Sequence, residues 1–407
     1  MSCHLAEGNI LHETLMYRVV YDFVCPVLPA WLSYVVAGLV IMIILVNMVL
    51  LGAAVFVWAE RRLLGRFHNR IGPNRWGPFG LLQPIADLVK LLTKEDLTPA
   101  NADRITFFAV PIVMVMPVIL VLAVVPFAKD TALANLNVGV LYVLAVTSLT
   151  SVAIFMAGWS SNNRYAMFGA IRGVAVLISY EVPVVLCLLG VVLVAGSMSL
   201  SGIVAAQTVP FLLVQPLALF VFLAGTSAEL NRTPFDVAEA ESELVAGFHI
   251  EYSGVKFALI QTAEIGGVLT ACAVTATLFL GGWSGPASSY LGWLWFAMKV
   301  AVIAFIFVWV RATFPRLRID QLMALAWKFL LPLSMINLFA TTLEVYFLRS
   351  DRGVLSSNDL WIMAGINLVV AVTSIALFGT LIREKVRPSK PAIPAGAVAP
   401  AALGEVS

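Results

Sequence analysis

The chain has 407 residues, of which 61% are hydrophobic and 12% are charged, and its formal net charge at pH 7 is +2. Together with 24 phenylalanines, this composition excludes a water-soluble globular protein. We expect no nucleic acid among the partners of a chain this hydrophobic.

Nine segments are long and apolar enough to cross a bilayer, which requires about 20 consecutive apolar residues. Because backbone polar groups in lipid must be hydrogen-bonded within their own segment, we expect these spans to be helices. The sequence therefore predicts an all-α, polytopic transmembrane helical bundle. In chain order the spans cover roughly 33–58, 105–127, 139–158, 173–195, 209–228, 256–281, 291–311, 329–347 and 360–382.

The spans form a single bundle over residues 33–385, in which no internal sequence repeat is evident. The preceding residues 1–32 lack the cationic start of a signal peptide, so we expect them to remain in the mature chain. Residues 386–407 are rich in proline and alanine and have no periodic apolar face. We expect this tail to be disordered.

Lysine and arginine gather in alternate connections between the predicted spans. Most of the 25 bases lie in the connections 59–104, 159–172, 229–254 and 312–328 or in the C-terminal tail. Since the cytoplasmic connections of membrane proteins are enriched in bases, we expect these four connections and the C-terminus in the cytoplasm. The N-terminus is then expected on the outer, periplasmic side.

The first connection, 59–104, is too long to be a simple turn. It opens with "AERRLLGRFHNRIGPNRWGPFG", which contains Arg61 and Arg70 and several glycines and prolines typical of turns. The following "LLQPIADLVKLLTKED" places its apolar residues on one stripe of a helix about three turns long. Such a helix lies in the membrane interface or packs against a partner. Asp87 lies on its flank, where Lys90 at i+3 could form a surface ion pair with it.

Several ionisable residues fall within the predicted spans, where a charge costs several kcal/mol unless it is paired or hydrated. Glu181 lies in the fourth span, Glu229 at the cytoplasmic end of the fifth, Glu264 about two turns into the sixth, and Lys299 within the seventh. Each is a candidate functional residue, and the alternative is an interior ion pair or a side chain that reaches water. Glu344 lies nearer the outside, and we favour a structural role for it.

The connection 229–254 contains the acid-rich stretch "RTPFDVAEAESELVAGFHIEY". Thr233 followed by Pro234 is typical of a helix start, so we expect a short acidic cytoplasmic helix from 234 to about 246. Arg311, at the end of the seventh predicted span, either pairs with these acids across the cytoplasmic face or serves only as an orientation signal.

Five carboxylates lie in this stretch. Asp236, Glu239 and Glu243 share one face of the predicted helix, Glu241 points elsewhere, and Glu251 follows the helix. Together with the glutamates inside the spans they form either a hydrated proton path into the bilayer or a solvated acidic face. For Asp236 a helix cap is an equal alternative.

Metal-binding and nucleotide-binding motifs are missing from the sequence. The four cysteines form no C-x-x-C, the four histidines have no ligand spacing, and there is no G-x-G-x-x-G. We therefore expect no metal site in this chain, and any redox metals belong to its partners.

Four long stretches make the chain resemble the quinone-site membrane subunit of respiratory complex I, the NADH–quinone oxidoreductase. The resemblance extends over about residues 30–385. The stretches are "ERRLLGRFHNRIGPNRWGPFGLLQPIADLVKLLTKED" (60–96), "GWSSNNRYAMFGAIRGVAVLISYEVP" (158–183), "AELNRTPFDVAEAESELVAGFHIEYSGVKFALIQTAEI" (228–265) and "VWVRATFPRLRIDQLMALAWKFLLP" (308–332).

The resemblance implies that Arg61, Arg70 and Asp87 lie beside a narrow quinone chamber. It therefore raises Asp87 from a surface ion pair to a residue of the quinone site. It also implies that the acids form a proton-coupling route. The residues expected in that route are Glu181, Glu229, Asp236, Glu239, Glu241, Glu243, Glu251 and Glu264.

Four bases are expected to act as counter-charges to these acids. The resemblance implies this role for Arg172 and Arg232, and Lys299 and Arg311 are further candidates. We expect no catalytic redox centre in the chain itself.

The resemblance further implies a subunit of a proton-translocating enzyme, with quinone as its substrate and neither metal nor flavin in this chain. The expected partners are peripheral-arm iron–sulfur subunits, membrane-arm pump subunits, the lipid bilayer and membrane quinone, in the cytoplasmic membrane of a bacterium. The alternatives are a homologous subunit of a membrane-bound hydrogenase-type complex, a stand-alone proton or cation transporter, and an assembly scaffold.

Overall fold

The computed structural model describes residues 15–24, 29–129, 131–236, 247–348 and 356–385. Within these ranges every regular element is a helix. The expected all-α, polytopic membrane architecture is thereby confirmed. The expected disordered tail, 386–407, lies outside the described residues.

Eight helices in the described part of the chain are long and apolar enough to cross a bilayer. Two of them are interrupted by a change of helix geometry rather than by a loop. The eight are α2 (Ala30–Phe67), α4 (Arg104–Val124), α5 (Gly139–Thr147) with α6 (Leu149–Ser160), α7 (Arg164–Ala195), α12 (Gly254–Phe279), α13 (Ser288–Thr313), α14 (Ile319–Leu325) with the π-helical η3 (Ala326–Leu330) and α15 (Leu331–Leu348), and α16 (Ser357–Lys385).

The span predicted at 209–228 is present as an interrupted helix. It is divided into α9 (Phe211–Val214) and α10 (Pro216–Glu229), with Gln215 between them. Pro216 has no backbone N–H to donate and disfavours helical geometry at the residue before it, which explains the break. At 1.5 Å per residue, α10 alone is about 21 Å long, too short to cross the hydrocarbon core without α9.

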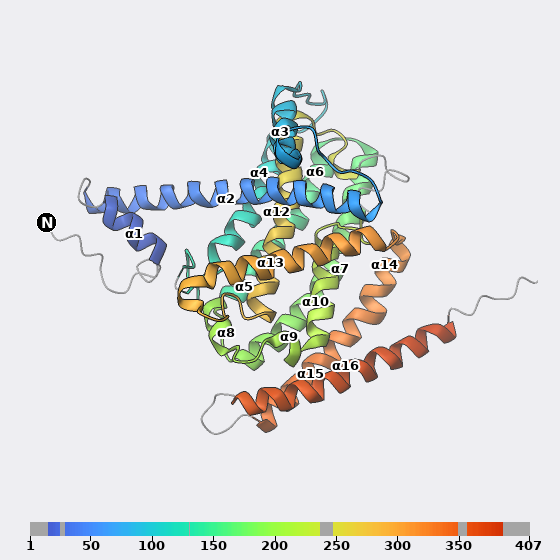
Figure 1. Ribbon diagram of the computed structural model, residues 1–407. Helices are drawn as coiled ribbons and strands as arrows, with labels where there is room; N and C mark the ends of the chain where they lie inside the picture. The colour runs from blue at the N-terminus through green and yellow to red at the C-terminus, as the bar shows by residue number, and fades with distance from the viewer. Residues whose placement is uncertain (1–14, 25–28, 130, 237–246, 349–355, 386–407) are drawn as a thin grey trace, which may run out of the picture.

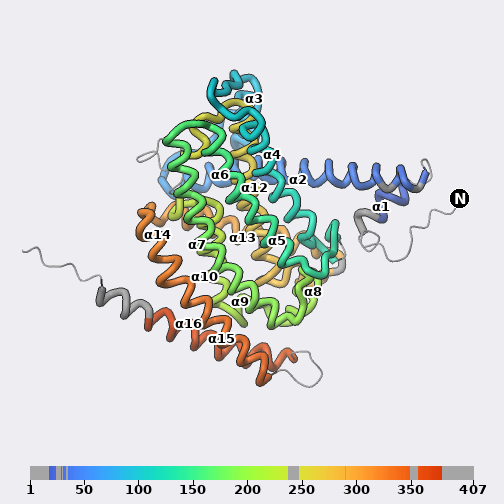
Figure 2. Tube along the Cα trace, turned by 180° about the vertical axis from the view of Figure 1, so that it is seen from behind, coloured from blue at the N-terminus to red at the C-terminus, as the bar shows by residue number. Residues whose placement is uncertain are grey.

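The long helix α2 lies across the bundle and extends beyond it. Figures 1 and 2 show its N-terminal half, with α1 (Leu15–Val24) beside it, projecting from one edge of the molecule. Exposed apolar side chains such as Val35, Leu39 and Ile43 cover this half, as expected of a surface in contact with lipid.

The predicted amphipathic helix of the first connection is α3 (Gln83–Thr93). None of its residues is buried, and the apolar stripe, including Ile85, Leu88 and Val89, faces outward from the chain. This exposed stripe fits a helix that rests on lipid or a partner, as expected from the sequence.

Hydrogen bonds join the four base-rich connections at one end of the bundle. The backbone N–H of Asp103 donates to Ser160 O (3.1 Å), that of Leu97 to Ser253 Oγ (2.8 Å), and that of Leu317 to Pro234 O (3.1 Å). Figure 1 shows α3 at this end and α8 (Leu200–Ala206) and α9 at the opposite end. We call these the charged end and the far end; which of them faces the cytoplasm stays a prediction.

The acidic helix predicted from residue 234 does not begin there. Residues 232–235 form a turn in which the N–H of Phe235 donates to Arg232 O (2.7 Å). The remaining part of that helix, residues 237–246, lies outside the described residues. The helix start expected at Thr233 and Pro234 is therefore wrong, because the chain forms a turn at these residues.

Candidate functional site: glutamates inside the bundle and the charged connections

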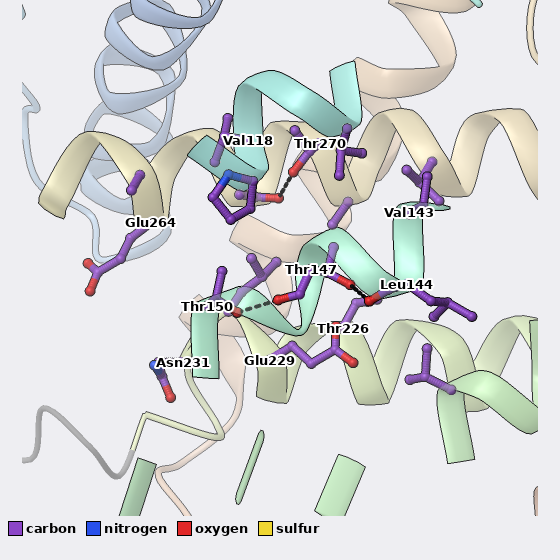
Figure 3. Close-up of a pocket in the computed structure, with 18 of the residues that line it drawn as sticks. Val118, Val143, Leu144, Thr147, Thr150, Thr226, Glu229, Asn231, Glu264 and Thr270 are labelled. Carbon is purple, nitrogen blue, oxygen red and sulfur yellow. Dashed lines mark hydrogen bonds between the residues drawn. The ribbon is translucent and has the colours of Figure 1, made fainter. Parts of the chain in front are cut away.

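A cavity of about 110 Å³ lies among α4, α5, α6, α7, α10 and α12. Apolar side chains form most of its wall, and the polar exceptions include Glu229 from α10 and Glu264 from α12. Figure 3 shows Glu229 near Thr147 and Thr150, with Glu264 set apart on the α12 side. Because one water needs roughly 10–15 Å³ of such space, the cavity has room for several waters.

A second cavity of about 20 Å³ adjoins the first. Its wall includes Glu181 from α7 and also Glu229, Thr147 and Thr150, which line the larger cavity as well. The two cavities therefore meet at Glu229. Glu181, Glu229 and Glu264 thus line one pair of adjoining cavities, although 83 residues of sequence separate the first from the last.

Close packing between α7 and α10 fixes the position of Glu229. A Cβ atom at Gly225 would lie 2.2 Å from Val184 Cγ2, so any larger residue would force Val184 or the helices to move. Glu229 follows one turn later, as the last residue of α10. The side chains of Thr226 and Ser227 are satisfied within the helix, since they donate to Phe222 O (2.9 Å) and Leu223 O (2.6 Å).

Glu181 is held by the residues that precede it on α7. The hydroxyl of Tyr180 donates to Leu322 O on α14 (3.0 Å), and the ring of Tyr180 packs edge-on against Phe235, with centroids 5.4 Å apart. Phe235 belongs to the acid-rich connection. The side chain of Tyr180 therefore connects the segment of α7 around Glu181 both to α14 and to the start of the acid-rich connection.

A buried carboxylate, Glu60, joins three segments at the charged end. Arg232 Nη1 lies 3.2 Å from Glu60 Oε1, and Arg311 Nη1 bonds to the same oxygen. Glu60 is 7% exposed. Two of the predicted counter-charges thus neutralise Glu60, an acid that is not among the site residues predicted from the sequence.

The acids of the 229–254 connection have separate partners. Asp236 Oδ2 accepts from Arg316 Nη2 (2.7 Å), and Glu251 Oε1 accepts from Asn163 Nδ2 (2.6 Å). Asn163 in turn caps α7, because its Oδ1 accepts from the N–H of Tyr165 (2.9 Å). Glu239, Glu241 and Glu243 lie outside the described residues, so their places in the route stay predictions.

The end of this connection is fixed to α4 by Tyr252. Its ring stacks on that of Phe107, with centroids 4.2 Å apart, and its hydroxyl is 3.2 Å from Ser160 Oγ. Burial raises the pKa of Tyr252 to about 12, and the hydrogen bond with Ser160 offsets part of that rise.

A buried lysine at the start of α12 makes a second attachment. Lys256 Nζ lies 3.0 Å from Asp96 Oδ1 and 4.2 Å from the ring centre of Phe108. The ammonium is thus held between a carboxylate and an aromatic face, a favourable arrangement for a desolvated cation. Sequence analysis missed Lys256, because its partners come from the first connection and from α4.

The remaining predicted counter-charges lie elsewhere. Arg172 is half-buried in the third turn of α7. Lys299 donates to Gly282 O (2.9 Å) and Ser284 O (2.8 Å) at the far end. No ion pair of Lys299 with an acid occurs within the described ranges, so the structure gives no support to its predicted role.

The first connection brings together two of its three predicted site residues. Arg61 Nη1 lies 2.5 Å from Asp87 Oδ2, and Gln83 Nε2 donates to Asp87 Oδ1 (3.1 Å). The partner of Asp87 is therefore a base on α2, whereas spacing had indicated Lys90 on its own helix. The pair is half-exposed, with 50% of the Arg61 side chain and 34% of the Asp87 side chain accessible.

Arg70 lies in an open cavity of about 590 Å³, together with Arg62 and Arg66. Phe79 and Pro73 in the wall of this cavity are brought together by a tight turn at Gly80, whose φ is +74° and whose Cβ would lie 2.3 Å from Pro73 O. Arg62 donates to Phe79 O (2.8 Å) and its guanidinium lies 4.8 Å from the ring centre of Phe79. The first connection therefore presents a basic pocket next to the Arg61–Asp87 pair.

Within the described part of the chain, no group of three or more His, Cys, Asp or Glu side chains is arranged to hold a metal ion. The two described cysteines, Cys187 and Cys272, are buried and unlinked. The polar groups of the site are carboxylates, guanidinium groups and hydroxyls, which bind and transfer protons and orient polar ligands.

The family model described as NADH dehydrogenase matches residues 39–342. The chain belongs to the NADH dehydrogenase family. A relative in this family, the H subunit of NADH-quinone oxidoreductase from Dehalococcoides mccartyi (strain CBDB1), is 51% identical over 340 residues, which cover 84% of this chain and 94% of the relative.

Two further relatives carry similar names. The H subunit of NADH-quinone oxidoreductase from Geobacillus kaustophilus (strain HTA426) is 52% identical over 291 residues, which cover 70% of this chain and 87% of the relative. Its counterpart from Geobacter metallireducens is 49% identical over 303 residues, which cover 71% and 90%. The resemblance noted from the four sequence stretches is thereby confirmed, as is the expectation that the chain is part of an enzyme complex.

Proposed function

We propose that the chain is the membrane subunit of a bacterial proton-translocating NADH–quinone oxidoreductase that forms part of the quinone chamber and couples quinone reduction to proton transfer. The observation that carries this proposal is the position of Glu229, which lines both cavities and so adjoins Glu181 in one and Glu264 in the other. Family membership supplies the enzyme, and the relatives' names supply quinone as the substrate.

The quinone site is proposed at the first connection, where Arg61, Asp87 and Arg70 lie near turns and exposed apolar residues. In this proposal the chain itself carries no redox centre. Electrons reach the quinone from iron–sulfur subunits of the peripheral arm. Two electrons and two protons convert a quinone to a quinol. The chain's own residues orient the head group, exclude bulk water and supply or relay those protons.

The coupling route is proposed to run from the acid-rich connection to the membrane glutamates. Glu60, Arg232 and Arg311 attach the start of that connection to α2 and α13, so a change of charge at the first connection alters the forces on the acids. Adjacent carboxylates in a poorly hydrated cavity are stable only if they share protons or bind water. Glu229 thus serves as the junction at which protons pass to partner pump subunits.

The charged end is proposed to face the cytoplasm, with the N-terminus outside and the C-terminus inside. This orientation rests on the excess of bases in the connections that meet there. The exposed stripe of α3 then lies on the cytoplasmic side, where the peripheral arm or the membrane surface covers it.

The proposal is tested by purifying the tagged chain in mild detergent. Iron–sulfur and flavin subunits should accompany it, and the preparation should reduce quinone with electrons from NADH. Isolation of the chain alone, or together with a hydrogenase in place of an NADH-oxidising arm, would contradict the proposal.

The coupling role is tested separately with Glu181→Gln in reconstituted vesicles. The variant should slow turnover or lower the number of protons moved per electron. The control is Asp320→Asn, because Asp320 is 65% exposed and pairs only loosely, at 3.4 Å, with its neighbour Arg318. An unchanged rate and proton stoichiometry in Glu181→Gln would remove Glu181 from the route.

A further inference from the structure

A second group of buried polar side chains lies near the far end of the bundle, away from the glutamate cavities. Its members come from the break between α9 and α10, from α15 and from α16, and each is at least nine-tenths buried. They are Gln215 (0% exposed), Asn337 (1%), Thr341 (0%), Glu344 (8%) and Asn367 (2%). We call them the far-end polar cluster.

Three members of the cluster converge on Gly190 of α7. Gln215 Nε2 donates to Gly190 O (3.2 Å). A Cβ atom at Gly190 would lie 3.4 Å from Asn337 Nδ2, 3.5 Å from Thr341 Oγ1 and 3.6 Å from Gln215 Nε2. The small residue and the helix break therefore bring polar groups from three elements to one point inside the bundle.

The carboxyl group of the cluster lies one turn further along α15. Thr341 and Glu344 are at i and i+3, so they lie on the same face of that helix. Asn367 Nδ2 on α16 donates to Glu344 Oε2 (2.8 Å). The cluster thus extends from Gly190 to the contact between α15 and α16.

Three buried polar atoms in the cluster have no hydrogen-bond partner among the described residues: Gln215 Oε1, Asn337 Nδ2 and Glu344 Oε1. Buried polar groups are almost always satisfied by protein or by internal water. Two of these atoms are acceptors and one is a donor, and water can serve both kinds. Interrupted helices in membrane proteins are also places where polar groups gather around a bound species.

The cluster is separate from the glutamate cavities. Gln215 and Glu229 bracket α10, so about 21 Å of helix lies between them. Buried apolar residues such as Leu217, Ala218 and Val221 lie in that interval, and no member of the cluster is in the wall of either glutamate cavity. By contrast, Glu344 lies four residues before the end of α15 at Leu348, which is about 6 Å along the axis.

Few other titratable groups lie near Glu344. The elements packed against α15 are α7, α10, α16 and η3. In the far half of these elements and of α15 itself, the described titratable side chains are Cys187 on α7, Tyr346 on α15 and Asp359 at the start of α16. The others lie towards the charged end: Arg164, Tyr165, Arg172, Tyr180, Glu181, Glu229 and Lys328.

We propose that the far-end polar cluster is a water-binding site in which Glu344 exchanges a proton with water at the far face of the membrane. The Glu344 O–H bond breaks, the proton passes to a bound water, and the return step reverses both changes. Asn367 holds one carboxyl oxygen, while Gln215 and Asn337 hold water. This site goes beyond the proposed function, which concerns the charged end and the glutamate cavities.

Infrared spectroscopy of the purified complex tests the site without measuring turnover. The Glu344→Gln variant should lose a C=O stretching band of a protonated carboxyl group, and in the unaltered complex this band should shift in D2O. The control Asp320→Asn should keep the band. Retention of every protonated-carboxyl band in Glu344→Gln, or a band that does not respond to D2O, would overturn the proposal.

The face that supplies the proton is tested in oriented vesicles. A pH step on the far face should change the intensity of the band, and a step on the charged-end face should not. The opposite pattern would overturn the proposal. If Glu344→Gln does not assemble, Asn367→Ala removes only the amide donor, and it should move the Glu344 band to higher frequency; an unmoved band would equally count against the site.

Discussion

Arg232 Nη1 lies 3.2 Å from Glu60 Oε1, an oxygen that also bonds to Arg311. The beginning of the acid-rich connection is thereby attached to the ends of α2 and α13. Because Glu60 is buried, each guanidinium group compensates a charge that would otherwise be desolvated and unpaired.

Glu60→Gln should destabilise the assembled protein. The substitution leaves two arginines facing a neutral amide, and removing one partner of a buried pair costs about 3 kcal/mol or more. The measurement is the thermal unfolding midpoint of the purified complex. Asp320→Asn, which changes an exposed carboxylate, should shift it little. A Glu60→Gln complex as stable as this control would show that the two arginines do not depend on Glu60.

Asp87→Asn should separate function from stability at the first connection. The Arg61–Asp87 pair is half-exposed, so its loss should lower the free energy of unfolding by only about 1 kcal/mol or less. If Asp87 belongs to the quinone site, quinone reduction should nonetheless fall by about tenfold, which corresponds to about 1.4 kcal/mol in the activation barrier. Full activity in an assembled Asp87→Asn complex would remove this residue from the site.

Tyr252→Phe should change how stability depends on alkaline pH. Burial raises the pKa of Tyr252 from 10.0 to about 12. Between these values the folded state keeps a proton that the unfolded state loses, so stability falls as pH rises from 10 to 12. The Tyr252→Phe variant has no hydroxyl to titrate at this position, so its free energy of unfolding should fall less between pH 10 and 12 than that of the unaltered protein. Parallel curves for the two proteins would contradict the assignment.

Gly225→Ala should displace Glu229 by separating α10 from α7. The added Cβ would lie 2.2 Å from Val184 Cγ2, and overpacking of this kind costs about 1–3 kcal/mol. Both the unfolding midpoint and the quinone-reduction rate should decrease. Gly38→Ala is the matched control, because a Cβ there meets no atom within 4 Å. Equal effects of the two substitutions would show that the close approach at Gly225 is not needed.

Helices and their approximate bounds could be predicted from the sequence, because length and apolar composition are local properties. The stripe containing Ile85, Leu88 and Val89 indicated α3 for the same reason. Pro216 is a local indication of the break at Gln215, but the surrounding residues 209–228 form a nearly continuous apolar run and were therefore predicted as one uninterrupted span. The turn at 232–235 was not predicted, because the rule for helix starts considers only neighbouring residues.

The membrane glutamates could be found because a charge inside an apolar run is conspicuous. Their meeting at Glu229 could not, since it depends on how α7, α10 and α12 pack. Glu60 was overlooked because its partners lie 172 and 251 residues away along the chain. Long-range ion pairs of this kind leave no pattern in the local sequence.

The central claim is that protons pass through the adjoining cavities at Glu229. The most direct measurement is the number of protons moved per electron by the Glu229→Gln complex in sealed vesicles, recorded together with its rate of quinone reduction. We predict that the rate of proton translocation falls by about a hundredfold, the lower end of what the loss of a proton-transfer group costs in rate, while the Asp320→Asn complex translocates protons at the normal rate. Normal proton stoichiometry and normal turnover in an assembled Glu229→Gln complex would contradict the account.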